Sequence, residues 1–451
     1  NELSPAFVRR GHRVTIVHRG GYPLPLTGEM RSGSGAGLDG HAQILYLSAA
    51  TPTFVRKEDM EGHLPELAKE LGELMAAGSF DLILSHYWDG ALLGVLANEA
   101  RAEPLPHYWI PHSLGALKRR NVDPAAHADL RIKERIAAEH RVLDVIDGVV
   151  ATSVAIQDSA EHDYGSGVDY FLPPGVDHER FRPRTAEECE AVWDFLAGQM
   201  GVAADDLRNR PLVLEISRTD TTKRKDVLLR AFAAVVDRDP RPLLAVTIDE
   251  INLRLHDELR NLISQLEIGS DVAVLGSVWE RLPCLYSEAA IYCTPSIMEG
   301  FGMSAQEAAA AGTAVIASDR VPFATEYLLG PGAPERSSST NAGIAVGAGG
   351  IVVRADSVEG FAAALDLLLS DGELRARLAY ALQHRIQRRR DELGAEAAGN
   401  PSERHRNARQ RVAPGGLEDD RAQGDHQHVT GIGGAVAHDG DEQQHGREQP
   451  R

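Results

Sequence analysis

The sequence predicts an α/β protein built from two parallel-sheet domains in tandem. Short apolar runs alternate with amphipathic segments such as 60–78 and 225–237, and this alternation is typical of parallel strands covered by helices on both faces. A second series of apolar runs begins near residue 211. The length of 451 residues also exceeds what one compact core usually holds. We therefore expect two domains, each with its own sheet.

The first series of expected strands follows a helix end and a turn at Gly11 and His12. Because a fold of this kind starts with a strand, a chain that opens on the end of a helix is expected to lack its first strand. The predicted first domain covers residues 1–172. Its expected strands are the apolar runs at 14–18, 43–47, 81–86, 107–112, 147–153 and 170–175.

The second series of expected strands begins after a joint near Pro173, Pro174 and Gly175, where proline and glycine interrupt regular structure. We predict a second domain over residues 173–390. Residues 391–451 contain no Phe, Trp or Tyr and few aliphatic side chains. Such a segment cannot bury enough apolar surface to offset the entropy of ordering, so we expect a disordered tail. The expected strands of the second domain lie at 211–218, 242–248, 271–277, 290–296, 313–319 and 349–355.

Composition and charge exclude several classes of protein. Hydrophobic residues make up 43% of the chain and charged residues 25%, which is ordinary for a soluble enzyme, and we find no apolar run long enough to span a bilayer. A formal net charge of −19 argues against nonspecific binding of nucleic acid. The three cysteines show no paired spacing, and no signal peptide is visible. We therefore expect a cytoplasmic protein without a disulfide framework or a cysteine zinc site.

Two glutamates in the second domain stand out, because glycines follow the first of them. Glu299 is followed by Gly300 and Gly302, and Glu307 lies just inside an expected helix. A strand, a glycine loop and a helix N-terminus in this order form a corner that favours anions such as phosphate. Ser304 and Glu307 also fit a capping box, which would account for Glu307 without any ligand. That alternative leaves Glu299 unexplained.

The segment 295–319, PSIMEGFGMSAQEAAAAGTAVIASD, resembles the glutamate-seven-residues-glutamate signature of retaining GT-B glycosyltransferases of glycosyltransferase family 4. The segment 216–233 resembles the Arg-plus-Lys diphosphate segment of that family, and 281–296 its usual lead-in to the signature. The resemblance covers most of the two predicted domains. Within the family, the chain is most similar to the sucrose-phosphate synthase branch in the segments 111–120, 132–153 and 173–181.

This resemblance implies two Rossmann-like domains that face each other across a cleft. It also implies transfer of a hexose from a nucleotide-diphosphate sugar to a sugar-phosphate acceptor, with retention of configuration and without a metal or cofactor. Other family 4 acceptors, such as inositol phosphate, a lipid or a glycan, stay open as alternatives. Among rival classes, an epimerase would lack the Glu299 and Glu307 pair and a phosphorylase would need a cofactor lysine and a much longer chain. A donor-binding protein without turnover stays open. The sequence does not indicate the nucleotide base, the oligomeric state or a protein partner.

Candidate residues for the donor site lie in the second domain. Departure of a nucleoside diphosphate adds negative charge, and Arg218 and Lys223 offer cations on the loop after a strand, with Lys225 as a competing candidate. By resemblance, Glu307 accepts hydrogen bonds from the ribose, while Glu299 holds the transferred sugar and favours positive charge developing on it. The resemblance places further donor contacts at Gly300, Phe301, Gly302, Met303 and Ser304.

Candidate residues in the first domain follow strands whose carboxyl ends face the cleft. His112 matches the family's histidine that contacts the donor sugar, which makes it a catalytic candidate beside Arg218, Lys223 and Glu299. Lys118 and Arg135 match positions that bind the acceptor's phosphate in sucrose-phosphate synthases. For both cations, the alternative is a role as ordinary charges on exposed helix faces. His86 and Asp89 also follow a strand, but their spacing does not demand catalysis.

Two departures from the family pattern lead us to expect slow turnover. The family opens with a strand and a Gly-Gly loop that approaches the diphosphate, whereas this chain begins just after that point. The family also ends with a helix that crosses back onto the first domain, whereas residues 383–406 run into low-complexity sequence here.

No acidic cluster suggests a divalent ion, so we expect Arg218, Lys223 and a helix N-terminus to balance the diphosphate charge.

Overall fold

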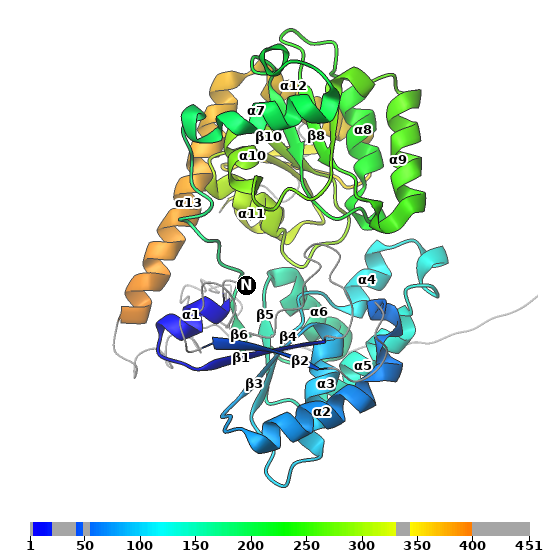
Figure 1. The fold of residues 1–451 in the computed structure, drawn as a ribbon, viewed down its shortest axis with the longest axis vertical. Coiled ribbons are helices and arrows are strands. Elements are labelled where there is room, and N and C mark those ends of the chain that lie inside the picture. Colours follow the sequence, from blue (N-terminus) through cyan, green and yellow to red (C-terminus); the bar gives the residue numbers. More distant parts are fainter. Residues whose placement is uncertain (1–2, 20–41, 48–54, 331–342, 399–451) are drawn as a thin grey trace, which may run out of the picture.

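The protein folds into two α/β domains, one above the other in Figure 1, as the sequence predicts. The computed structural model describes residues 3–19, 42–47, 55–330 and 343–398. The first domain occupies the lower half of Figure 1 and the second domain the upper half. The chain passes between them in the segment that joins β6 to α7.

The first domain contains a parallel sheet in the order β3-β4-β5-β6 and a separate parallel pair, β1 and β2. Its core surrounds two buried tryptophans, Trp88 and Trp109. The strands are β1 (Val14–Arg19), β2 (Ala42–Leu47), β3 (Ile83–His86), β4 (His107–Ile110), β5 (Gly148–Ala151) and β6 (Tyr170–Phe171). The α-helices are α1 (Leu3–Arg9), α2 (Leu64–Ala77), α3 (Tyr87–Glu99), α4 (Gly115–Asn121), α5 (Ile132–Leu143) and α6 (Val154–Tyr164).

One edge of β1 and one edge of β3 carry no strand among the residues that the structure describes. The large cleft described below extends along both strands, and Val17, Leu67 and Ile83 are among the apolar side chains that line it there. Apolar side chains on a parallel sheet and its helices are normally covered by a neighbouring strand or helix. The expected first strand before α1 stays a prediction.

The second domain contains one seven-stranded sheet in the order β12-β13-β11-β10-β7-β8-β9. All neighbouring strands are parallel except β12, which pairs antiparallel with β13. The strands are β7 (Leu212–Glu215), β8 (Leu243–Thr247), β9 (Val272–Leu275), β10 (Ile291–Thr294), β11 (Ala314–Ser318), β12 (Ile344–Val346) and β13 (Ile351–Val353). The α-helices are α7 (Ala186–Met200), α8 (Lys225–Ala233), α9 (Leu253–Gln265), α10 (Leu282–Glu288), α11 (Met303–Ala310), α12 (Val358–Ser370) and α13 (Gly372–Ala398).

The central strands of this sheet are buried along their whole length, which explains their continuous apolar sequences. Successive side chains point to opposite faces of the sheet, so Val213 and Leu214 belong to different apolar clusters. One cluster includes Tyr286 on α10, and the other includes Phe232 on α8. Helices on both faces therefore cover the sheet, as the sequence predicts.

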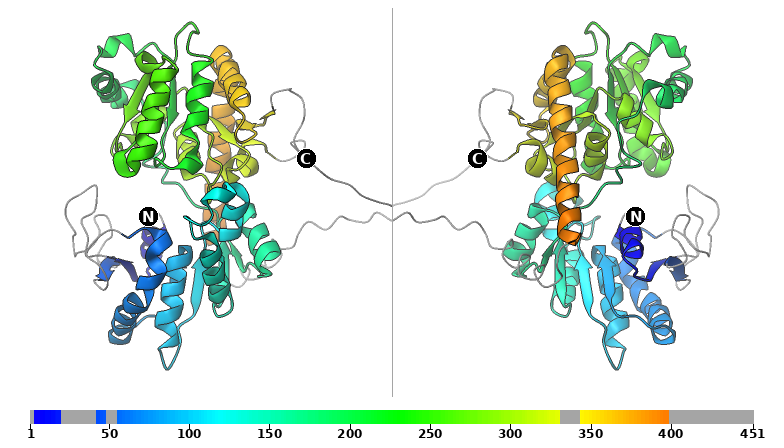
Figure 2. Two further views of the ribbon diagram at one scale, coloured as in Figure 1. Left: turned by 90° about the vertical axis from the view of Figure 1, so that its right-hand side faces the viewer. Right: turned by 90° about the vertical axis from the view of Figure 1, so that its left-hand side faces the viewer.

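The C-terminal boundary differs from the expectation. The second domain was expected to end at residue 390, but helix α13 continues to Ala398. It packs on α11, β11 and α12, and its end extends towards the level of the first domain (Figure 2). The remaining part of the expected tail, 399–451, lies outside the described residues. Strand β12 was also not predicted from the sequence.

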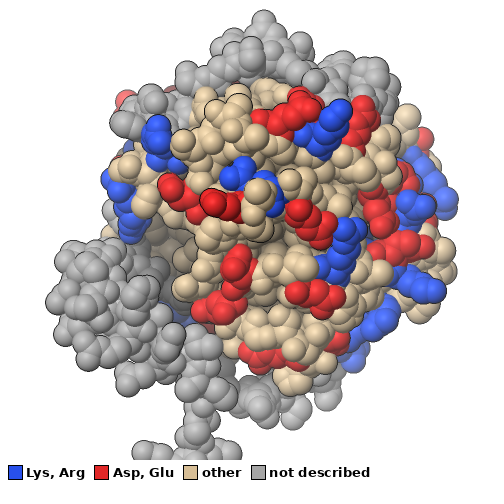
Figure 3. Space-filling model, turned by 90° about the horizontal axis from the view of Figure 1, so that it is seen from below, with Lys and Arg blue, Asp and Glu red and all other residues tan. Residues whose placement is uncertain are grey.

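The described surface and helices can be compared with those of nucleic-acid-binding proteins and of membrane-spanning proteins, which the composition argues against. Acidic and basic side chains are interspersed on the face shown in Figure 3. That face therefore offers no continuous basic surface of the kind that nucleic acids bind. Within the described ranges, none of the helices combines the length and the apolar content that a membrane crossing requires.

Candidate functional site

A cleft with a volume of about 1710 Å³ lies where the loops of the two domains meet. Both sheets present the carboxyl ends of parallel strands to it, which is the usual location of ligands in open α/β sheets. The first domain contributes His86, Asp89, His112, Lys118 and Arg135 to its lining, and the second contributes Arg218, Lys223, Glu299 and Gly300. The structure thus brings together candidates from distant parts of the sequence.

At Gly300 the backbone of the second domain closely approaches the first domain beside the cleft. A Cβ atom built at Gly300 would lie 1.9 Å from the carbonyl oxygen of His112. The backbone of His112 itself adopts a positive φ of 56°, two residues after the end of β4. Only glycine lets the loop of the second domain reach this carbonyl, so Gly300 is required by close packing.

Gly300→Ala is expected to open the cleft and to lower turnover. Overpacking of this kind costs about 1–3 kcal/mol, which corresponds to about a 5- to 150-fold change in the population of the closed form. Gly276→Ala is the matched control, because a Cβ atom there meets nothing within 4 Å. The two variants are compared by kcat and by small-angle scattering. Unchanged kcat and radius of gyration in Gly300→Ala would show that the domains do not need this contact.

His86 and His112 form a pair at the carboxyl ends of the neighbouring strands β3 and β4. Nδ1 of His86 lies 2.8 Å from Nε2 of His112, and the two rings are nearly parallel, at 13°. Burial lowers the pKa of His112 to about 4, with a further contribution from His86, and burial also lowers the pKa of His86. Both imidazoles are therefore neutral near neutral pH, and one donates a hydrogen bond to the other.

Lys223 and Glu299 are joined by an ion pair in which Nζ lies 2.5 Å from Oε1. Their loops are also connected through the backbone, because the N–H of Ile297 donates to the carbonyl of Thr222 over 2.8 Å. Arg218 is exposed and lines the cleft on the same loop as Lys223. Two candidate cations and one candidate carboxylate thus line this part of the cleft, which Asp220, Asp249, Arg254 and Glu258 also line.

Lys225, the competing candidate, has a different environment. Its side chain is buried and lies beneath the loop that carries Arg218 and Lys223. The ammonium group forms an ion pair with Glu215 and donates to Ser217 Oγ over 3.0 Å. Of these two candidates, Lys223 therefore lines the cleft, whereas Lys225 is bonded to protein groups inside the domain.

The capping-box interpretation of Ser304 and Glu307 is wrong. Helix α11 begins at Met303, and its N-cap is Gly302, which adopts a φ of 106° and provides no side chain. Ser304 is therefore already inside the first turn. Glu307 instead accepts a hydrogen bond of 3.2 Å from the hydroxyl of Tyr286, whose pKa is raised by burial and by Glu307.

The glycine loop has one side chain that points away from the cleft. Phe301 is buried against Phe323 and Tyr327 of the second domain, so it offers a ligand only its backbone. Met303 is partly exposed at the first position of α11, where no side chain caps the helix. The first N–H groups of α11 are therefore oriented to bind an anion. Glu307 is half-buried and is not among the residues that line the cleft.

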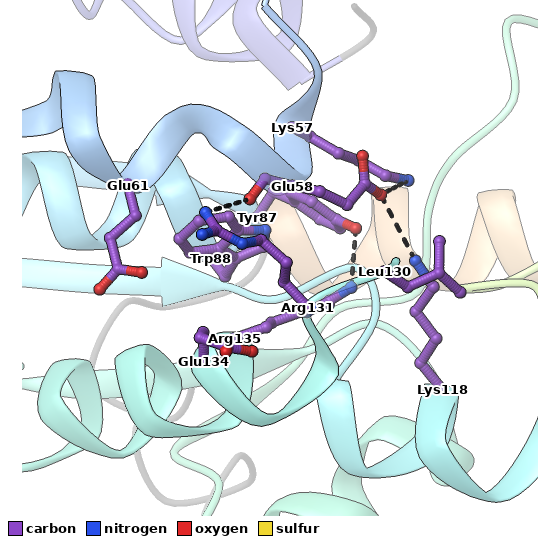
Figure 4. A pocket seen from close by; sticks show the side chains of 10 residues that line it. All are labelled: Lys57, Glu58, Glu61, Tyr87, Trp88, Lys118, Leu130, Arg131, Glu134 and Arg135. Carbon is purple, nitrogen blue, oxygen red and sulfur yellow. Dashed lines mark hydrogen bonds and ion pairs between the residues drawn. The ribbon is translucent and has the colours of Figure 1, made fainter. Parts of the chain in front are cut away.

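A smaller pocket opens beside the cleft in the first domain (Figure 4). Lys118 is 6% exposed there, and its Nζ lies 3.7 Å from Oε1 of Glu58. The same oxygen lies 3.9 Å from Nζ of Lys57. Burial, with a contribution from Lys57, lowers the pKa of Lys118 to about 8. Sequence reasoning missed Lys57 and Glu58, since nothing in the sequence indicates that a short 3₁₀ helix (Lys57–His63) packs here.

Arg135 lies in this pocket but is held by protein groups. Its three nitrogens donate to Oε1 of Glu139 over 2.8 Å, to the hydroxyl of Tyr87 over 2.8 Å and to the carbonyl of Ser113 over 2.6 Å. Burial opposes the charge, but Glu139 outweighs it and raises the pKa of Arg135. Arg135 therefore orders the Tyr87 and Ser113 side of the pocket, in addition to any contact with a ligand.

In the described ranges, no cluster of three or more His, Cys, Asp or Glu side chains is arranged to hold a metal ion. Cys189, Cys284 and Cys293 are free thiols. Metal independence stays a prediction.

Two protein-family models match the chain. Residues 1–180 match Glycosyltransferase Family 4, and residues 205–385 match Glycosyl transferases group 1. The two matches together include both sides of the cleft.

Two curated proteins illustrate the range of similar sequences. Mannosylfructose-phosphate synthase of Agrobacterium fabrum is 28% identical over 296 residues, which are 62% of this chain and 63% of that protein. D-inositol 3-phosphate glycosyltransferase of Nocardia farcinica is 30% identical over 311 residues, which are 67% of this chain and 61% of that protein. The matched part of the chain thus spans less than two thirds of each of these relatives.

Sucrose-phosphate synthase from Thermosynechococcus elongatus is one of the similar solved structures. It aligns with a TM-score of 0.70 at 22% identity, over 86% of this chain and 87% of that one. This likeness confirms the two-domain GT-B fold expected from the sequence.

Proposed function

The chain belongs to the glycosyltransferases of group 1 and family 4, and we propose that it transfers a hexose from a nucleotide-diphosphate sugar to a sugar phosphate with retention of configuration. One observation carries this proposal most directly. A pocket lined by Lys57 and Lys118 opens beside the cleft in which Arg218, Lys223 and Glu299 lie. We therefore infer two separate places for phosphate groups, one for the donor and one for the acceptor.

The second domain supplies the donor side of the proposal. Arg218 and Lys223 provide charge for the diphosphate, and the uncapped N-terminus of α11 adds backbone donors. The charge on the diphosphate grows as the glycosidic bond breaks, so cations that are already in place favour the transition state. Glu299, held by Lys223, is available to accept hydroxyl groups of the transferred sugar.

The first domain supplies the acceptor side. Lys57 and Lys118 both pair with one carboxylate oxygen of Glu58, at 3.9 and 3.7 Å, so a phosphate that displaces this carboxylate would contact both ammonium groups. A phosphate bound there would place the rest of the acceptor towards the cleft, which Lys118 also lines. We infer that the acceptor's hydroxyl then approaches the donor sugar on the face of the leaving diphosphate, whose oxygen takes the proton.

The neutral histidine pair contributes hydrogen bonds to this arrangement. His112 lines the cleft opposite Gly300, and its pKa of about 4 keeps it uncharged near neutral pH. We propose that it contacts the donor sugar and that His86 fixes which ring nitrogen carries the proton. The donor is a substrate, so the proposal includes no cofactor. We place the reaction in the cytoplasm, in keeping with the free thiols.

The nature of the phosphorylated acceptor is tested by measuring release of nucleoside diphosphate. UDP-, GDP- and ADP-hexoses are each combined with fructose 6-phosphate, inositol 3-phosphate or their dephosphorylated forms, with and without EDTA. We expect a sugar phosphate to stimulate release and EDTA to have no effect. Preference for inositol 3-phosphate would instead assign the chain to the family 4 enzymes whose acceptor is an inositol phosphate. Tight donor binding without release under any condition would identify a binding protein.

Lys118 is expected to make acceptor use depend on pH. The protonated ammonium attracts phosphate, and its pKa of about 8 lies below the ordinary value of 10.5. A phosphate monoester has already lost its second proton at about pH 6, so kcat/KM for the acceptor should fall as the pH rises through about 8. Lys118→Met should lower kcat/KM about 10- to 150-fold near neutral pH, the loss expected from one charged hydrogen bond, and should abolish this decline.

Lys69→Met is the control for Lys118→Met, because Lys69 is an exposed lysine of the same domain. It should keep both the wild-type kcat/KM and the wild-type pH profile. A decline above pH 8 that persists in Lys118→Met would assign the titration to another group.

A further inference from the structure

The loop that carries Arg218 and Lys223 is closed at its base by a buried ion pair. Glu215 is the last residue of β7, and Lys225 is the first residue of α8. Residues 216–224 therefore form the loop between them, and the carboxylate and the ammonium group meet directly beneath it. The side chains of Glu215 and Lys225 are 0% and 1% exposed, respectively.

Lys225 also holds the start of the loop. Its Nζ donates to Oγ of Ser217 over 3.0 Å and to the carbonyl of Ser217 over 3.2 Å. Thr247, at the end of β8, holds the same residue. Its Oγ1 accepts from the N–H of Ser217 over 3.0 Å and donates to the carbonyl of Ser217 over 2.6 Å. Since Arg218 follows Ser217 directly, these contacts determine where its side chain begins.

The ion pair is poorly explained by stability alone. Removing two charges from water is costly, and well-packed apolar side chains of the same size are often as stable as a buried pair, or more so. The second oxygen of Glu215, Oε1, is buried without a hydrogen-bond partner among the described residues, which adds to the cost. The bonds from Lys225 to Ser217 are what an apolar pair would fail to reproduce.

We propose that Glu215 and Lys225 are positioning residues that hold the loop 216–224 so that Arg218 and Lys223 meet the donor's diphosphate. This inference rests on the proposed function, because it concerns how the same site binds its donor. Neither residue contacts the ligand, and both act through Ser217 and through the ends of the loop. A small displacement of a cation from the position that the transition state requires lowers the rate strongly.

The test is the double variant Glu215→Leu/Lys225→Met, which removes both charges and leaves neither one buried alone. We expect an unchanged or higher Tm, a kcat at least about tenfold lower, and a Kd for inorganic pyrophosphate at least about tenfold higher. The Kd of the preferred free nucleoside should stay the same, because it does not use the diphosphate loop. A purely structural role would instead lower Tm and leave kcat per folded molecule and pyrophosphate binding unchanged, which would overturn the inference.

A second pair of variants keeps the test decisive if the double variant does not fold. Thr247→Val removes a hydroxyl that holds Ser217 without changing any charge, and Thr247→Ser retains that hydroxyl. We expect Thr247→Val to lower kcat and to weaken pyrophosphate binding, and Thr247→Ser to restore both. Equal kcat and equal pyrophosphate affinity in the two variants would overturn the inference.

Arg241→Met serves as the control. Arg241 forms an ion pair with Asp271 over 2.7 Å. Asp271 precedes β9, at the amino ends of the strands, and the cleft lies at their carboxyl ends. Loss of Arg241 should leave kcat and pyrophosphate binding unchanged. If the wild-type protein itself does not bind pyrophosphate, the proposed function fails. If it binds and the Glu215→Leu/Lys225→Met variant binds equally well, only the positioning role fails.

Discussion

Arg218→Ala is expected to lower kcat by about 10²–10³-fold, the loss measured when one preorganised donor to a developing negative charge is removed from other enzymes. Arg218 lies exposed in the cleft on the loop that begins at β7. The diphosphate gains negative charge only as the glycosidic bond breaks, so most of the loss should appear in kcat and little in the Kd of the intact nucleotide-sugar donor.

Arg260→Ala is the matched control for this experiment, because Arg260 is an exposed arginine on α9 of the same domain. It should leave kcat and Kd unchanged. A loss of affinity for the intact donor in Arg218→Ala that is as large as the loss in kcat would show that Arg218 stabilises the bound ground state. An unchanged kcat would remove Arg218 from the proposed mechanism.

Glu307→Ala is expected to weaken donor binding by about 10- to 150-fold, the range for loss of a hydrogen bond to a charged group. Gly302 takes the N-cap of α11, so Glu307 is not needed to cap that helix, and its contact with the ribose stays a prediction. The sharpest readout compares the preferred nucleoside diphosphate with its 2′-deoxy and 3′-deoxy forms. The wild type should lose affinity for a deoxy form, and Glu307→Ala should bind both forms equally.

Two further variants separate binding from helix stability. Tyr286→Phe removes the hydroxyl that donates to Glu307 over 3.2 Å, so it should weaken donor binding less than Glu307→Ala does. Ser304→Ala should keep Tm close to that of the wild type, since Ser304 does not cap the helix. A Glu307→Ala variant that still discriminates against deoxy forms would place the ribose elsewhere.

Many elements of the fold could be predicted because their sequence patterns follow from local burial. The strands β7, β8, β10 and β11 have continuous apolar sequences, since both faces of each are covered. Strand β12 could not be predicted in this way. It has only three residues, Ile344–Val346, and pairs antiparallel with β13 at the edge of the sheet, where periodicity over so few residues indicates nothing.

The capping box failed for a related reason. Ser304 and Glu307 have the right spacing, but spacing does not reveal which residue begins the helix. Gly302 takes the N-cap with a φ of 106°, and a Cβ atom there would lie 2.5 Å from Val321 Cγ1. Both the backbone angle and the packing therefore require glycine at this position.

The sequence by itself determined the alternation of strands and helices, the division into two domains and the signature that assigns the chain to its family. These are properties of residue type and spacing along one segment, so they can be read without the fold. Only the tertiary structure decided that Lys223 lines the cleft while Lys225 is buried with Glu215. It also decided that Lys57 and Glu58 join Lys118. Contacts of this kind depend on which segments pack together and on the direction of each side chain, and neither is encoded in the spacing of a single motif.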